Sequence, residues 1–169
     1  MPIFFATTKK NQSIEFPANL SDFIIEKCYS KNKYDITDGK TTYQLDLSSS
    51  EDDLKHDILS HALTLRLGGP VSSFAIYQNI PASLLDTMSN KSECDLSKRT
   101  LVKVSEKIQG VIPTIDALEQ MRGHLKEHFV LFAYLRNQDV LHREGLILTP
   151  SDEIYCATAH SPFVKKDSS

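Results

Sequence analysis

The chain has 169 residues, of which 40% are hydrophobic and 24% charged, a composition typical of a folded domain and not of a disordered segment. Its 19 basic and 22 acidic residues leave a net charge of -3, which gives no electrostatic reason to expect nucleic acid as a partner. No apolar run reaches the roughly 18 residues that a membrane helix requires, and residues 1–8 lack the layout of a secretory signal.

The cysteines predict free thiols and no disulfide framework. Cys28, Cys94 and Cys156 are odd in number, lie far apart and include no C-x-x-C pair. This pattern suits a reducing compartment, so we expect a cytoplasmic location, either in the producing cell or in a cell into which the protein is delivered. No repeat or linker divides the chain, so residues 1–164 are expected to form one domain, followed by a disordered tail at 165–169.

The first predicted elements are short. Residues 3–5 and 13–16 are expected to form a strand pair, and Pro17 closes that region. Ser21 then fits the N-cap position of a helix that runs through Phe23 and Cys28 and ends near the polar residues 30–33, because its hydroxyl can accept a hydrogen bond from a free amide of the first turn.

A β-hairpin is the clearest local signal. Residues 34–37 and 41–47 flank Asp38-Gly39, a pair that suits the positive backbone angles of a two-residue turn. Alternate positions of the second strand are apolar: Tyr43, Leu45 and Leu47. One face of the hairpin is therefore expected to be buried and the other to face water.

A capped helix follows. Ser50 is its predicted N-cap, and the acidic residues at 51–53 lie where the positive end of the helix dipole favours them. Its apolar stripe consists of Leu54, Ile58, His61, Ala62 and Leu65. Gly68-Gly69-Pro70 is expected to end the helix. His61 is predicted to be a hydrogen-bonded core residue and His56 a surface residue, and about 140° between them prevents joint metal binding.

The middle of the chain is less sharply defined. Residues 71–78 are predicted to form a strand and residues 81–88 a short helix. The polar stretch 89–95 is expected to be disordered. Residues 97–108 fit either a helix or a strand, and the sequence leaves both open.

The last third predicts a helix followed by a meander. Thr114 is the expected cap of a helix whose stripe is Ile115, Leu118, Met121 or Arg122, Leu125 and Phe129. Three strands are predicted, at 130–136, 140–148 and 153–160. The expected fold class is therefore α+β, with an antiparallel sheet of about five or six strands packed by three to five helices.

One short motif points to metal chemistry. His124-Leu125-Lys126-Glu127-His128 resembles the H-x-x-E-H signature of the inverted zinc proteases, in which two histidines bind zinc and a glutamate activates water. Those enzymes need a third ligand far downstream, and little chain follows His128. Glu127 also points away from the two histidines on a regular helix. We expect no metal, and a zinc site on His124 and His128 is the alternative.

A basic cluster is the one candidate binding site. Arg136, His142 and Arg143 fall on two predicted strands joined by a tight turn, so some of these side chains meet on one face. They suit a carboxylate, a phosphate or an acidic partner surface. The alternative is an edge strand that its charges keep soluble.

No other catalytic constellation emerges. Cys28 and Cys156 are predicted to be core residues, and Cys94 lies beside Asp95, which disfavours a thiolate. Phosphate-binding loops are missing from the sequence. Residues 65–70 and 161–163 resemble segments of the chorismate lyases, but the arginine and glutamate of such an enzyme have no counterparts, so we assign no family.

By elimination, the expected function is that of a non-catalytic cytosolic protein–protein interaction module, such as an adaptor, a regulator or a delivered effector. The partner is another protein or a second copy, and no cofactor, nucleic acid or membrane span is expected. The alternative is a small hydrolase or lyase, with His124 and His128 as candidate metal ligands. An enzyme predicts a deep polar pocket, whereas an interaction module predicts an exposed apolar patch or an unpaired strand edge.

Overall fold

The computed structural model describes residues 2, 4–6, 15–30, 32–89, 96, 99–123, 126 and 146–156. Six strands form an antiparallel sheet in the order β1-β5-β6-β4-β3-β2. These strands are β1 (Phe4–Ala6), β2 (Ile24–Ser30), β3 (Lys33–Thr37), β4 (Thr42–Asp46), β5 (Phe74–Gln78) and β6 (Leu101–Glu106). A separate antiparallel pair consists of β7 (Leu146–Leu148) and β8 (Ile154–Cys156). The predicted α+β class with an antiparallel sheet is confirmed.

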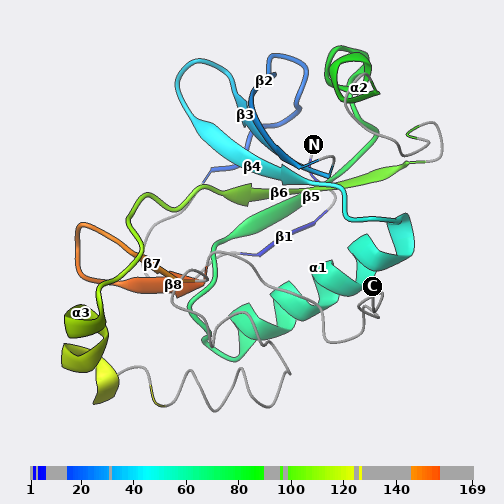
Figure 1. Ribbon diagram of the computed structural model, residues 1–169. Coiled ribbons are helices and arrows are strands. Elements are labelled where there is room, and N and C mark those ends of the chain that lie inside the picture. The colour runs from blue at the N-terminus through cyan, green and yellow to red at the C-terminus, as the bar shows by residue number, and fades with distance from the viewer. Residues whose placement is uncertain are drawn as a thin grey trace, which may run out of the picture.

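Helices lie on both faces of the main sheet. They are α1 (Glu51–Arg66), α2 (Ala82–Ser89) and α3 (Ile115–Gln120). Figure 1 shows α1 along one face, α2 on the other face, and α3 next to the β7–β8 pair. No helix in the described part of the chain is both long enough and apolar enough to cross a membrane.

Each face of the main sheet has its own hydrophobic core. The core on the α2 side gathers residues from β3, β4, β5, β6 and α2, among them Tyr34, Leu45, Leu84 and Val104. The second core joins α1 to β5 and to the β7–β8 pair through Leu65, Phe74, Leu146 and Cys156. This second core fixes α1 against the sheet and leaves the opposite side of the helix free to face outward.

The predicted hairpin is confirmed as β3 and β4. Tyr43, Leu45 and Leu47 are buried, as the alternation indicated. The turn has four residues instead of two, because Thr37 pairs with Thr42. The Asp38 carboxylate accepts hydrogen bonds from the amides of residues 40 and 41 at 2.9 Å, and Gly39 has a φ of 88°.

Both ends of α1 match the prediction. The Ser50 hydroxyl accepts from the Asp53 amide at 3.1 Å. At the other end, the Gly68 amide donates to the Leu65 carbonyl and the Gly69 amide to the Thr64 carbonyl. This is a Schellman cap, and Gly68 takes the left-handed conformation that such a cap requires, with a φ of 81°.

The helix predicted from the Ser21 cap through Cys28 to near residues 30–33 is wrong. Residues 24–30 form the edge strand β2, which pairs with β3. Two register shifts, between Ile25 and Lys27 and between Cys28 and Ser30, interrupt its alternation. Bulges remove the period of two that identifies a strand in a sequence, so the apolar residues imitate helical spacing.

The predicted pairing of residues 3–5 with 13–16 is not seen among the described residues. β1 pairs with β5, with Phe5 opposite Ala75. Residues 15 and 16 are not in a strand, and residues 13 and 14 lie outside the described part. The partner of β1 is far away in sequence, which local patterns do not reveal.

Three other elements of the middle region are settled. The strand predicted over 71–78 is present as β5, and the short helix over 81–88 is present as α2. Residues 97–108, left open between helix and strand, contain β6, which lies between β4 and β5. Of the stretch 89–95, predicted to be disordered, Ser89 is the last residue of α2 and residues 90–95 lie outside the described residues.

The C-terminal third is confirmed in part. Thr114 caps α3 through the Ala117 amide at 3.2 Å, and β7 and β8 are joined by the predicted turn at 149–152. Ile115, predicted to be buried, is 67% exposed, because α3 packs against the second core through Leu118 and Met121 instead. The strand predicted at 130–136 and the tail at 165–169 lie outside the described residues.

Gly110 permits a close approach between two segments. The next residue, Val111, forms a β-bridge with Leu148. A Cβ atom on Gly110 would lie 2.3 Å from the Leu148 carbonyl oxygen and 2.5 Å from Cγ2 of Ile147. Backbone atoms cannot move aside as the end of a flexible side chain can. A side chain at position 110 would therefore push the two segments apart.

We therefore expect Gly110→Ala to lower the free energy of unfolding by about 1–3 kcal/mol, the usual range for overpacking a packed site. Gly123→Ala is the matched control, since a Cβ atom there meets nothing within 4 Å. Urea denaturation followed by circular dichroism measures both variants. Equal urea midpoints for the two variants would show that the close approach at Gly110 does not limit the stability of the fold.

Candidate interaction surface

The exposed side of α1 is apolar in its C-terminal half. Leu59, Leu63 and Leu67 follow one another at intervals of four residues and are 57%, 40% and 52% exposed. Successive residues four apart lie about 40° from each other around a helix, so these leucines form a stripe that is centred on Leu59 and Leu63 and has Leu67 at its edge. A soluble helix normally places polar residues on its outer side, so the exposed apolar stripe is a departure from the usual pattern.

Charged residues flank Leu59 and Leu63 on both sides along the helix. Asp52 lies in the first turn of α1 and Arg66 in the last, and both are exposed, as is Lys55. Asp52 and Arg66 have no ion-pair partner among the described residues. We define the outer face of α1 as Asp52, Lys55, Leu59, Leu63 and Arg66. From Asp52 to Arg66 it extends about 21 Å.

The inner side of α1 anchors the helix firmly. Leu54 is fully buried, and Leu65 belongs to the second core. The centre of the His61 ring lies 4.3 Å from the centre of the Phe74 ring. The Ser48 hydroxyl donates to the Asp57 carboxylate at 2.5 Å near the start of the helix. The outer face is therefore carried by a rigid element.

His61 and Lys103 form a buried polar pair beneath α1. The Nε2 atom of His61 lies 2.7 Å from the Ser72 carbonyl oxygen, and Nδ1 lies 3.2 Å from Nζ of Lys103. A carbonyl oxygen only accepts, so Nε2 carries the proton and Nδ1 accepts from the ammonium. The prediction that His61 is a hydrogen-bonded core residue is confirmed.

The surroundings of His61 keep its ring neutral. Burial lowers the pKa of His61 well below its usual value, and the positive charge of Lys103 lowers this pKa further. The hydrogen bond to Ser72 acts in the opposite direction but does not compensate. A protonated ring would also lose the lone pair that accepts from Lys103.

Replacing Lys103 with methionine is expected to raise the pKa of His61 towards its usual value. The change removes a nearby positive charge while keeping most of the volume of the side chain. The measurement is an NMR titration of the His61 ring protons in both proteins. An unchanged or lower pKa in Lys103→Met would contradict the electrostatic coupling of this pair.

A second buried charge lies near the edge of the sheet. Asp35 is 1% exposed, and its Oδ2 atom accepts hydrogen bonds from the Tyr29 hydroxyl at 2.7 Å and from Nζ of Lys107 at 2.5 Å. Its other oxygen, Oδ1, has no hydrogen-bond partner within the described structure. The hydrogen bond with Asp35 raises the pKa of Tyr29 and that of Lys107.

The buried charged residues Lys103 and Asp35 lie on the same polar face of the main sheet. On the α1 side, the registers of β3, β4 and β6 place two rows of polar residues next to each other: Lys103, Asp46 and Lys33, then Ser105, Gln44 and Asp35. The hairpin side predicted to face water is thus half-buried at Gln44 and Asp46 and buried at Asp35. Burial also lowers the pKa of Lys33.

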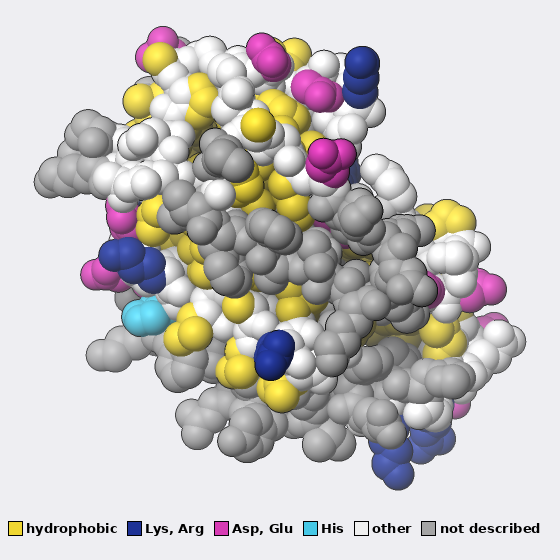
Figure 2. All heavy atoms as spheres, turned by 180° about the vertical axis from the view of Figure 1, so that it is seen from behind, with side chains coloured by type: hydrophobic (Ala, Val, Ile, Leu, Met, Phe, Trp, Pro, Cys, Tyr) yellow, Lys and Arg dark blue, Asp and Glu magenta, His cyan; other side chains and the backbone are white. Residues whose placement is uncertain are grey.

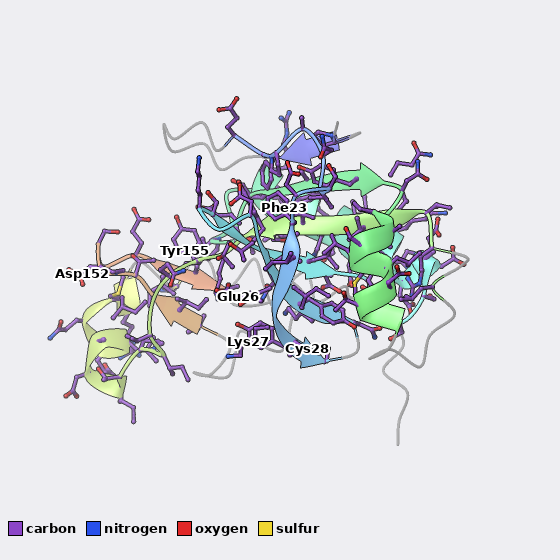
Figure 3. The ribbon with its side chains drawn as sticks, turned by 90° about the horizontal axis from the view of Figure 1, so that it is seen from above. Phe23, Glu26, Lys27, Cys28, Asp152 and Tyr155 are labelled. Atoms are coloured by element: carbon purple, nitrogen blue, oxygen red, sulfur yellow. The ribbon has the colours of Figure 1, made fainter. Side chains whose placement is uncertain are left out.

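The edge strand β2 is protected against pairing. Figure 3 shows Glu26, Lys27 and Cys28 along this strand, with Asp152 and Tyr155 apart from them on the β7–β8 pair. β2 carries two register shifts, and the Nζ atom of its exposed Lys27 lies 4.7 Å from the centre of the Tyr29 ring. Bulges and an edge lysine are devices that prevent another strand from adding to a sheet. β2 is thus a poor docking edge.

The cysteines divide between core and surface. Cys156 is buried in the second core, as predicted, and burial raises the pKa of its thiol to about 12. Cys28, predicted to be a core residue, is exposed because β2 is an edge strand and not a helix. Both thiols are free, and the described residues contain no disulfide. Cys94 lies outside them.

The site residues proposed from the sequence lie outside the described residues. This holds for His124 and His128 of the H-x-x-E-H motif and for the basic cluster Arg136, His142 and Arg143. Both sites therefore remain predictions. Within the described ranges, no three His, Cys, Asp or Glu side chains gather in a way that would hold a metal ion.

Sequence reasoning missed the outer face of α1, although a signal was present. The same helix carries Leu54 and Leu65 on its buried stripe and Leu59, Leu63 and Leu67 outside it. An amphipathic surface helix usually has one apolar stripe, so apolar residues on a second side of α1 were a visible exception in the sequence. The chain matches no protein family model, and no curated protein is significantly similar to it.

Proposed function

We propose that this protein is a non-catalytic protein–protein interaction module of the cytosol, and that its partner docks on the outer face of α1. The observation that carries this proposal is the exposed leucine stripe on a firmly anchored helix. Burying a leucine side chain contributes about 1.5–3 kcal/mol, so two or three such residues supply the core of a modest interface.

Other exposed apolar residues fit this role less well. Hydrophobic side chains reach the surface at several points on the face seen in Figure 2. The exposed residues Val111, Ile112 and Ile115 lie at the β-bridge and at the start of α3, a short helix. The stripe on α1, in contrast, lies on a regular helix of 16 residues, and charges border it.

The test is a comparison of three tagged baits in a native extract: the wild type, Leu59→Glu/Leu63→Glu, and the control Ile115→Glu. Ile115 is 67% exposed, so its replacement also puts a charge at an exposed apolar position. We expect the wild type and the control to retain the same protein by mass spectrometry and the double variant to lose it. Identical recoveries from all three baits would contradict the proposal.

One observation favours a second candidate function, a small hydrolase or lyase. Lys103 and Asp35 are buried charged residues on the same face of the sheet, and active sites often collect such groups. This candidate predicts turnover of simple nitrophenyl esters or phosphates that Lys103→Met abolishes. Rates equal to buffer, or equal for wild type and variant, would contradict it.

A further inference from the structure

We propose that the partner docking on the outer face of α1 is a second copy of this chain, which packs α1 antiparallel against α1 of its partner about a two-fold axis at Leu59. This inference rests on the proposed function, since it names the partner of the same surface. It is carried by the order of charges along the helix, which makes the face complementary to itself.

The positions of the charges follow from helix geometry. Asp52 and Arg66 each lie seven residues from Leu59, and seven residues complete nearly two turns. Both therefore lie within about 20° of Leu59 around the helix axis. The outer face thus has an acid at one end, leucine in the middle and a base at the other end.

A two-fold axis at Leu59 brings opposite charges together. In an antiparallel pair, a residue seven positions before Leu59 meets the residue seven positions after it in the partner. Asp52 of each chain then faces Arg66 of the other, and Leu59 packs on its own copy. Leu63 lies against the alkyl part of Lys55. The helix dipoles are also antiparallel, which is favourable.

A competing register has its axis at Leu63 and places Leu59 against Leu67 of the other chain. It joins more leucines but leaves Asp52 and Arg66 without partners. Leu67 is the C-cap of α1 and lies about 80° from Leu59 around the axis, so it does not share one contact line with Leu59 and Leu63. The charge-matched register uses the full length of the face.

The interface is small, so the association is weak. Stable dimers bury about 800 Å² on each partner, which is more than the outer face of one helix offers. We expect a dissociation constant on the order of 10–100 μM. Exposed ion pairs add little affinity, but they determine which register forms.

The experiment is sedimentation equilibrium over micromolar to sub-millimolar concentrations of the full chain. We expect the mass of the wild type to rise from 19.0 kDa for one chain towards twice that value. Asp52→Arg and Arg66→Asp each place like charges opposite each other twice and are expected to weaken association on the order of tenfold. Leu59→Glu is expected to abolish it.

The decisive sample is an equimolar mixture of Asp52→Arg and Arg66→Asp. In this mixture both contacts join arginine to aspartate, so a heterodimer is expected with about the affinity of the wild type. The double variant Asp52→Arg/Arg66→Asp is expected to form a homodimer, also with about the affinity of the wild type, because each arginine again faces an aspartate. Recovery on mixing also shows that the single variants are folded. The matched controls are Asp86→Arg, an exposed charge on α2, and Arg122→Asp, an exposed charge just after α3.

Two results would overturn the second copy as partner. One is a wild type that stays monomeric at every concentration, and the other is a dimer that the charge exchanges do not affect. With either result, the proposed function is still tested by the bait comparison. A protein other than this chain that the wild type retains and Leu59→Glu/Leu63→Glu loses would still identify the outer face of α1 as a docking surface. Failure of both experiments rejects the interaction role.

Discussion

Replacing Phe74 with alanine is expected to lower the free energy of unfolding by about 3–5 kcal/mol. Phe74 is fully buried in β5, belongs to the second core and contacts the His61 ring. Alanine leaves a cavity between α1 and the sheet that the surrounding strands cannot close. Since a domain has about 5–15 kcal/mol of stability in total, this one change removes a large share of it.

The measurement is chemical denaturation of Phe74→Ala with Phe74→Leu as the matched variant. Leucine keeps most of the apolar volume and is expected to cost about 1–1.5 kcal/mol. Hydrogen exchange of the α1 amides shows whether the helix loosens along with the global loss of stability. A loss below about 1 kcal/mol for Phe74→Ala would mean that α1 is not anchored through this residue.

Acid is expected to destabilise the protein through His61. The folded state lowers the pKa of His61 well below its usual value, so below about pH 6.5 the unfolded chain binds a proton that the folded chain does not. The contribution of the neutral ring is complete above that pH and is lost as pH falls towards the lower folded pKa. The slope reaches at most about 1.4 kcal/mol per pH unit.

The control for this prediction is His61→Gln, which does not titrate. Its amide group can donate to the Ser72 carbonyl and its oxygen can accept from Lys103, as the two ring nitrogens do. Urea midpoints measured from pH 7.5 down to pH 5 should diverge, with the wild type losing stability faster. Parallel curves for the two proteins would show that His61 is not the acid-sensitive group.

Strong local signals explain which parts of the fold were predictable. The β3–β4 hairpin combines strict alternation with Asp38-Gly39, and α1 has a cap at Ser50 and a stop at Gly68. These features depend on residues close together in sequence. The sequence of β2 predicts a helix instead of a strand because two bulges interrupt its alternation.

The candidate site was harder to predict because it depends on tertiary packing. Lys103 and Asp35 are charged residues that sequence rules place at the surface, yet both are buried. The leucines on the outer face of α1 show the reverse, since hydrophobic residues are expected inside. The sequence pattern identified the side of α1 that packs on Phe74 and β5, but it did not show that nothing in the described structure covers the leucines on the other side.

The most direct test of the central claim is site-specific photo-crosslinking in cells that produce the protein. A photoreactive residue replaces Leu63 on the outer face of α1 and, in a control, replaces the exposed Ile115. We predict an adduct of defined mass from position 63 that Leu59→Glu abolishes, with no such adduct from position 115. Absence of an adduct at position 63, or the same adduct from both positions, would contradict docking on α1.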